Sequence, residues 1–377
     1  MKNIFVSLFV IGLLILFFML LPTPDEPQQD DEQVTIISGA TVFDGNTWLG
    51  KTDVAFQRGL IIALGPRLTN KHKTANVIDA SGQYLIPGLI DAHTHAWDNA
   101  LKEAVKYGVT TELDMFTNNA FASTQRPLRE QHNVDVQQAD LFSAGTLITA
   151  PKGHGTEYGF EIDTIENAAQ ANDFVMARIN EGSDYIKIVY NATSRYMPSI
   201  DKETLHALVK AAHQQGKLAV VHISDLQSAR DAIDAGADGL VHAYVGKVQP
   251  EQLASLVKLM ANNKQFMIPT LSIIASMMGQ NNSSQLMADF SNEPRFKIDD
   301  VSSQLSNLRT DSNRQSLFEM TQQQVSLLHN AGVMILAGTD APNPGTAHGI
   351  SMHLELQLLV ESGLTPTQAL MAATSNV

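Results

Sequence analysis

Eight apolar, strand-like runs alternate with helical patterns from about Tyr84 onward, and this alternation limits the fold more than any other feature of the sequence. The runs are LIPGLIDAHTHA, VTTELDMF, DLFSAGTLI, YIKIVY, LAVVHI, GLVHAY, QFMIPTL and VMILAGTD. Such alternation predicts βα units around a parallel sheet. Eight units in roughly 290 residues predict an α/β protein built on a (β/α)8 TIM barrel.

The helices between these runs are recognised by their periodicity. One helix is predicted from the spacing of Leu205, Leu208 and Ala212 and ends at Gly216, and another begins at the capping box of residues 365–368. A doubly wound sheet is the alternative fold. That fold usually has a glycine-rich phosphate turn after its first strand, and this sequence has none.

Three segments are expected before the barrel. Residues 1–21 hold an apolar run, preceded by Lys2, that we predict to be a hydrophobic helix acting as a membrane anchor; a cleaved signal is the main alternative, although no A-x-A-like site ends the run. Residues 22–33 form an acidic linker, and residues 34–83 a small β domain. Positive charge before the run and acid after it place the body outside the cytoplasm, in the periplasm or at the cell surface.

Composition narrows the chemistry. A net charge of −14 without any basic cluster argues against nucleic acid as a partner. Because the chain has no cysteine, a metal site would have to be built from histidines and carboxylates.

Histidines gather at the ends of the predicted strands. His93 and His95 are two positions apart and so share one face of the first strand. His222, His242 and Asp340 close three later runs. A barrel brings the carboxyl ends of its strands together, so this set predicts a divalent metal site, whereas any one of these residues alone would more often be a satisfied polar group.

Lys187 lies inside the apolar run YIKIVY. Burial would lower its pKa and leave a neutral amine, and such an amine reacts with CO2 to give a carbamate that can bridge two metal ions. A lysine that reaches solvent with its amine, or one that pairs with an acid, is an alternative that the residues leave open.

Three further residues are candidates for substrate contact. They are His154 in a glycine-rich loop after the third run, Tyr190 just past Lys187, and His348 in the loop after Asp340. Each is also compatible with an ordinary loop position.

The segments IPGLIDAHTHA, YIKI, VVHI, LVHAY, AGTDAP and HGISMHLELQLLVESGLTPTQALMAATSN resemble the amidohydrolase superfamily from about Val34 to the last residue. The nearest branch is the imidazolonepropionase-like and Xaa-Pro dipeptidase-like one, which has a lysine on strand four. The resemblance implies two divalent metal ions, usually Zn2+. It assigns His93, His95 and Asp340 to one ion and His222 and His242 to the other, with carboxylated Lys187 and a hydroxide between them.

The activity implied by the resemblance is hydrolysis of amide or peptide C–N bonds in small substrates, such as dipeptides, N-acyl amino acids or cyclic amides. The bridging hydroxide would attack the carbonyl, and Asp340 would be the catalytic acid–base. The alternatives are a mononuclear deaminase, an organophosphate or lactone hydrolase on the same site, and a non-catalytic membrane-tethered binding protein. A deaminase would usually carry a glutamate after His222, where this chain has Ser224 and Asp225.

One departure from the family concerns the small β domain. In the family it is a composite sandwich completed by strands after the barrel, whereas this chain stops at Val377, before such strands. We therefore expect an incomplete sandwich and a chain truncated at its C-terminus, with residues 84–377 forming the barrel. An uncovered sheet edge is prone to association, and this favours truncation as the explanation. A homo-oligomer is a further candidate partner state.

Overall fold

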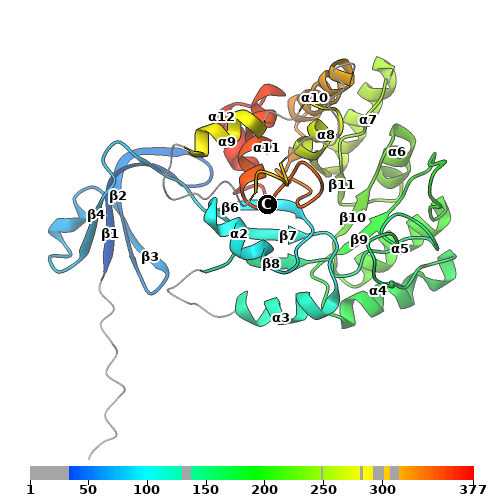
Figure 1. Cartoon of the computed structure of the whole chain (residues 1–377), viewed down its shortest axis with the longest axis horizontal. Coiled ribbons are helices and arrows are strands. Elements are labelled where there is room, and N and C mark those ends of the chain that lie inside the picture. The colour runs from blue at the N-terminus through cyan, green and yellow to red at the C-terminus, as the bar shows by residue number, and fades with distance from the viewer. Residues whose placement is uncertain (1–33, 130–136, 248, 281–282, 292–300, 306–313) are drawn as a thin grey trace, which may run out of the picture. The chain divides into compact units, whose positions relative to one another are not determined.

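The computed structural model describes residues 34–129, 137–247, 249–280, 283–291, 301–305 and 314–377 (Figure 1). Two compact units divide this part of the chain. The first contains Lys51–Gln83 together with the described residues up to Ala40, and the second contains Thr41–Gly50 and Tyr84–Val377.

The first unit is built on a small sheet. Its strands are β1 (Thr35–Phe43), β2 (Trp48–Gln57), β3 (Leu60–Gly65) and β4 (Asn76–Asp79), in the order β3-β2-β1-β4, and β5 (Tyr84–Leu85) pairs with the far end of β1. A short 3-10 helix, η1 (Leu68–Asn70), follows β3. Asp53 fixes the centre of this unit, because its carboxylate accepts hydrogen bonds from the Ser38 hydroxyl and from the backbone N–H groups of Gly39 and Leu68.

The second unit contains eight parallel strands in two sheets, one ordered β6-β7-β8 and the other β13-β12-β11-β10-β9. All eight coincide with the runs predicted from the sequence, although each strand is shorter than its run. Their bounds are Leu89–Thr94 (β6), Val109–Asp114 (β7), Asp140–Ser143 (β8), Ile186–Val189 (β9), Ala219–His222 (β10), Gly239–Val241 (β11), Phe266–Ile268 (β12) and Met334–Ile335 (β13).

Isolated parallel bridges connect the edges of the two sheets at both sides. Thr94 at the end of β6 pairs with Ala341 after β13, and Ile148 after β8 pairs with Ile188 in β9. The backbone N–H of Ala92 also donates to the carbonyl of Ala337, 2.8 Å away. Hydrogen bonding therefore continues from each sheet to the other.

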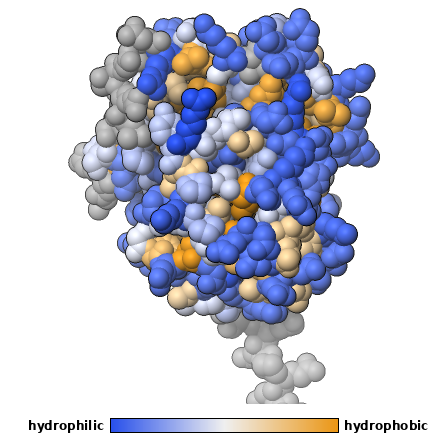
Figure 2. All heavy atoms as spheres, turned by 90° about the vertical axis from the view of Figure 1, so that its right-hand side faces the viewer, coloured by the Kyte–Doolittle hydropathy of each residue, from blue (hydrophilic) through white to orange (hydrophobic). Residues whose placement is uncertain are grey.

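Helices separate successive strands, and several pack on the strands they connect, for example α2 on β7, α3 on β8 and α5 on β9 and β10. The face seen in Figure 2 is largely hydrophilic, with apolar residues in small, separate patches, as expected for helices that turn one side to solvent. The helices are α2 (Ala100–Lys106), α3 (Asn119–Arg129), η2 (Ala168–Gln170), α4 (Ala171–Asn180), α5 (Lys202–Gln214), α6 (Leu226–Asp234), α7 (Pro250–Asn263), α8 (Leu271–Met277), α9 (Ser283–Ser291), α10 (Gln315–Asn330), α11 (Ile350–Glu361) and α12 (Pro366–Ala372).

An inner apolar cluster takes one buried residue from each of the eight strands or the residue beside it. The large core between strands and helices is a separate cluster. The inner one consists of Ala92, Met115, Ala144, Tyr185, Val220, Val241, Ile268 and Leu336. The eight strands thus share one interior.

The local helix predictions agree with the structure. Leu205, Leu208 and Ala212 are buried on α5, and the capping box of residues 365–368 begins α12. The predicted membrane segment and acidic linker, residues 1–33, lie outside the described residues. Within the described part of the chain, no helix has the length and apolar character needed to cross a bilayer.

Candidate metal centre

One cavity of about 440 Å3 brings together all six residues predicted as metal ligands, and it also contacts His154. The ligand candidates come from four strands or the residues just after them, and from the loop that follows a fifth strand. They are His93 at the end of β6 with His95 just after it, Lys187 in β9, His222 at the end of β10, His242 just after β11, and Asp340 in the loop after β13.

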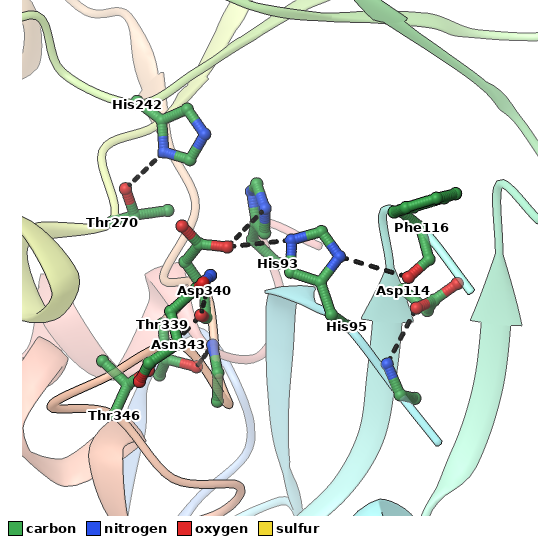
Figure 3. A network of polar contacts seen from close by, with 12 residues as sticks. His93, His95, Asp114, Phe116, His242, Thr270, Thr339, Asp340, Asn343 and Thr346 are labelled. Atoms are coloured by element: carbon green, nitrogen blue, oxygen red, sulfur yellow. Dashed lines mark hydrogen bonds and ion pairs between the residues drawn. The ribbon is translucent and has the colours of Figure 1, made fainter. Parts of the chain in front are cut away.

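His93, His95 and Asp340 form the tightest group in this cavity (Figure 3). The Nε2 atom of His93 lies 3.2 Å from Oδ1 of Asp340, and Nε2 of His95 lies 3.0 Å from the same oxygen. One ligand atom from each residue fits within 4.8 Å of the other two, and all three residues are buried. This group could hold a metal ion.

The hydrogen bonds of His95 fit a cation between these side chains. Its Nδ1 contacts the carbonyl oxygen of Phe116 at 3.2 Å, and because a carbonyl only accepts, Nδ1 must carry the proton. In the neutral ring, Nε2 then turns a lone pair toward the Asp340 carboxylate, which is also an acceptor. Two acceptors this close repel each other unless a proton or a cation lies between them, and imidazole and carboxylate are ligands that zinc accepts.

The other histidines extend this group into a row of imidazole rings. The ring centroids of His93 and His242 are 5.0 Å apart, those of His242 and His222 4.6 Å, and those of His222 and His154 4.9 Å. The Thr270 hydroxyl, 2.8 Å from Nδ1 of His242, orients that ring. Such a support from a second side chain is typical of metal-binding histidines.

Burial keeps three of these rings in the form that binds metals. It lowers the pKa of His93 to about 3, with the nearby Lys187 adding to the effect, and holds the pKa of His222 and His242 well below the ordinary value. For Asp340, burial alone would raise the pKa, but the electrostatic interaction with His93 outweighs it and holds the pKa well below its usual range. Neutral imidazoles beside an ionised carboxylate are a suitable ligand set.

Lys187 is 4% exposed and its Nζ atom has no hydrogen-bond partner among the residues that the structure describes. Burial lowers the pKa of its amine to about 7, although the Asp340 and Asp114 carboxylates favour the charged form. An unpaired amine in the interior is costly unless something else satisfies it. After the hydrogen bonds of His95, the Lys187 amine without a described partner is the second observation that fits a metal centre in the cavity.

Asp91, which the sequence placed on the same face as His93 and His95 without assigning it a role, connects β6 with the loop that carries Asp340. Its Oδ1 accepts from the backbone N–H groups of His93 at 3.1 Å and Thr339 at 3.0 Å, and its Oδ2 lies 2.6 Å from the Thr339 hydroxyl. Burial, together with the nearby Glu112, raises the pKa of Asp91 to about 8. Thr339, which donates two of these hydrogen bonds, directly precedes Asp340. Asp91 therefore sets the spacing between β6 and the loop after β13.

His154 is the one predicted substrate contact that reaches the cavity. Its Nδ1 pairs with Oε1 of Glu157 at 2.6 Å, and the other Glu157 oxygen accepts from the backbone N–H of Gly155. Glu157 was not predicted, although its position three residues after His154 in a turn was a usable signal. The pair leaves Nε2 of His154 available to the cavity.

Tyr190 and His348 are not among the residues that line this cavity, and substrate contact by them stays a prediction from the sequence. The Tyr190 hydroxyl donates to Asp231 on α6 at 2.8 Å, because Tyr190 is three residues after Lys187 and therefore faces the helices. His348 is buried, with Nδ1 2.8 Å from Oε1 of Glu112. Both side chains hold structural elements together.

The chain combines a parallel α/β fold with a buried group of histidines and a carboxylate where its strands end. This combination defines the class: an α/β protein with a candidate metal centre at the carboxyl ends of its strands. Within this class, the sequence profile of the Amidohydrolase family matches residues 84–376. The chain belongs to the Amidohydrolase family, as its sequence motifs predicted.

Individual relatives are more distant. An imidazolonepropionase from Geobacillus thermodenitrificans is 29% identical over 154 residues, which are 35% of this chain and 34% of that protein, so the chain aligns with about a third of this relative's length. Among solved structures, an ochratoxinase from A. niger has a TM-score of 0.66 at 20% identity, covering 92% of this chain and 84% of that one. A Xaa-Pro dipeptidase structure has a TM-score of 0.66 at 20% identity, over 91% and 87%. At these identities the structural likeness concerns the fold.

Proposed function

We propose that this protein is a metal-dependent hydrolase of C–N bonds in small amides. The observation that carries the proposal is the convergence of His93, His95, Asp340, Lys187, His222 and His242 on one cavity at the strand ends. Membership of the Amidohydrolase family supports it. In this proposal His93, His95 and Asp340 hold one divalent ion, and His222 and His242 hold a second.

Bound divalent ions, for which zinc is the expected identity, would polarise the substrate carbonyl and acidify water. The Asp340 carboxylate, kept ionised by its interaction with His93, would accept a proton from the attacking water and deliver it to the leaving nitrogen. His154, oriented by Glu157, would donate or accept a hydrogen bond at the substrate through Nε2. Water adds across the C–N bond, giving a carboxylate and an amine.

Lys187 has a separate role in this proposal. Its neutral amine would attack CO2, forming an N–C bond and releasing one proton, to give an anionic carbamate with two oxygen atoms. The carbamate would satisfy the interior position where the amine has no hydrogen-bond partner among the described residues. Two oxygens from one side chain can contact two ions at once.

We further propose that the eight strands of the second unit form one closed (β/α)8 barrel. Two observations support this: parallel bridges join both pairs of sheet edges, and the inner apolar cluster draws on every strand. In a barrel, active sites lie at the carboxyl ends of the strands, where this cavity is found.

For the segments before the barrel we propose the organisation expected from the sequence, with residues 1–21 as a membrane anchor, residues 22–33 as a linker and residues 34–83 as a small β domain. The apolar run in residues 1–21, with the charges that flank it, supports the proposed anchor. The small sheet of β1 to β4 supports the proposed β domain.

Metal analysis of the purified chain tests the proposed function. We expect about two zinc equivalents per chain, as for two-metal hydrolases, loss of metal and activity in Lys187→Ala, and neither loss in the control Lys258→Ala, which changes an exposed lysine on α7. One equivalent that Lys187→Ala leaves unchanged would favour a mononuclear deaminase. Absence of metal and of amide hydrolysis would contradict the proposal.

A further inference from the structure

The cavity has two chemically different parts. Its floor carries the six ligand candidates, whereas its walls are mostly apolar. Helix α8 and the residue after it supply one wall through Ile273, Ile274, Met277 and Met278. Other segments supply the remaining apolar lining, through Phe116, Leu147, Val189, Ile223, Ala243, Val245 and Pro344. A volume of about 440 Å3 is in the range that holds a small organic molecule.

The walls carry no lysine or arginine in the described part of the chain. Lys187 is the one such residue among the described lining residues, and its amine is buried at the floor beside the ligand candidates. The polar groups on the walls are Ser224, Tyr158, Asn343 and His154, and the His154 ring is already paired through Nδ1 with the Glu157 carboxylate. An acid, Glu157, lies next to the cavity through its contact with His154.

A substrate with a free carboxylate would therefore be poorly accommodated. A dipeptide or an N-acyl amino acid bound with its amide at the floor would bring its carboxylate against mostly apolar walls, where the described residues supply no lysine or arginine and His154 is already paired with Glu157. An ionised carboxylate that loses water without such a partner is strongly disfavoured. The negative field of the chain, with its net charge of −14, acts in the same direction.

We infer that the substrates are neutral amides with apolar groups on both sides of the scissile bond, rather than dipeptides or N-acyl amino acids. This inference rests on the proposed amide hydrolysis and specifies its substrate class. It narrows the range of substrates implied by the resemblance. The described walls can contact apolar groups of a substrate but lack a site for its carboxylate.

A matched pair of substrates tests the inference on the full metal-loaded chain. N-(3-methylbutyl)benzamide and N-benzoylleucine share the same scissile amide and differ by the carboxylate alone. We expect kcat/KM for the neutral compound to be higher by about tenfold or more. An equal or higher value for N-benzoylleucine would overturn the inference and leave the proposed function standing.

A binding experiment distinguishes failure of the inferred selectivity from failure of the proposed amide hydrolysis. It uses the corresponding non-hydrolysable sulfonamides, N-(3-methylbutyl)benzenesulfonamide and N-(phenylsulfonyl)leucine. Isothermal titration should give the neutral compound the lower Kd by about tenfold or more. If neither amide is hydrolysed but this preference holds, amide hydrolysis fails and the selectivity of the cavity stands. If the carboxylate compound binds as tightly, the selectivity fails.

A cation placed on the wall should reverse the preference. Met277 lines the cavity and is 46% exposed, so arginine can be accommodated there. Met277→Arg should improve kcat/KM for N-benzoylleucine by about tenfold and weaken that for the neutral amide. Met176→Arg is the matched control, because Met176 is 37% exposed on α4 and does not line the cavity. Equal effects of both variants would contradict a local role of the wall.

Discussion

Asp91 holds His93 and the loop of Asp340 at a fixed spacing through three hydrogen bonds. Asp91→Ala should weaken zinc binding by about 10- to 100-fold, the range for residues that orient metal ligands. Asp91→Asn should bind nearly normally, because the raised pKa of Asp91 already favours a neutral side chain of the same shape. Competition with a chromogenic chelator measures both affinities, and unchanged zinc binding in Asp91→Ala would show that Asp91 does not position the ligands.

His348 and Glu112 form a buried pair away from the cavity. Burial alone would lower the pKa of His348, but Glu112 outweighs it and raises the pKa above its ordinary value of about 6.5. The charged pair therefore contributes stability below that ordinary pKa, and the contribution is lost as pH rises through the raised value.

His348→Gln should accordingly lower the free energy of unfolding by about 3–5 kcal/mol at pH 6, the range for breaking a buried pair. The difference from the unchanged protein should narrow as pH rises, and denaturant titrations at pH 6 and pH 9 measure it. Zinc content serves as the control and should stay constant. A variant with unchanged stability but a raised KM would support the substrate contact predicted from the sequence.

The orientation of some side chains in this region could be predicted from the sequence, and that of others could not. The alternation of strand residues was enough to place His93, His95 and Lys187 toward one interior, and the same rule would have turned Tyr190 outward. His348 follows no strand period, so its position in a loop gave no direction. Asp91 was quoted in the first run, but its bond to Thr339 joins residues 248 positions apart and could not be read from spacing.

Among the elements, the segment after β13 approaches β6 at Gly338. A Cβ atom at this position would lie 2.8 Å from the backbone nitrogen of His93 and 2.6 Å from Cγ2 of Ile268. Gly338→Ala should therefore push the Asp340 loop away from β6. We expect zinc content to fall below half of the normal value while the secondary structure, measured by circular dichroism, is retained.

Gly332→Ala provides the control for this prediction. Gly332 has φ +84° and open space around it, so alanine there should cost about 1 kcal/mol of stability through backbone strain alone. Its zinc content should be unchanged. Equal zinc loss in both variants would mean that general destabilisation, rather than the contact between Gly338 and His93, governs metal binding.

The elements themselves were largely predictable, because each of the eight strands lies within an apolar run and α5 follows its periodicity. The residues at which the elements end were less predictable. Asp340 was expected at the end of a strand, but β13 stops at Ile335 and the carboxylate comes from the following loop, where Asp340 has φ +60°. That conformation depends on tertiary contacts such as the one between Asp91 and Thr339, which local sequence does not encode.

At the scale of the molecule, the first unit exposes apolar side chains on its edge strand β3. Leu60, Ile61 and Leu64 are 66%, 71% and 50% exposed. Apolar edge strands promote pairing between chains. We expect the sedimentation coefficient to rise with protein concentration, and Ile61→Lys to reduce this rise. Leu218→Lys, at a site 52% exposed in the second unit, is the control; similar behaviour of both variants would rule out β3 as the contact.

The hydrogen bond between Asp91 and Thr339 also has a consequence for when the chain could bind the proposed metal ions. Its two ends are separated by most of the chain, so a nascent polypeptide that has exposed His93 and His95 still lacks the opposite half of the centre. Before residue 339 is in place, His93 and His95 could offer a metal ion two imidazole ligands but not the Asp340 carboxylate. The complete proposed ligand group therefore exists only after these distant segments have come together in the finished fold.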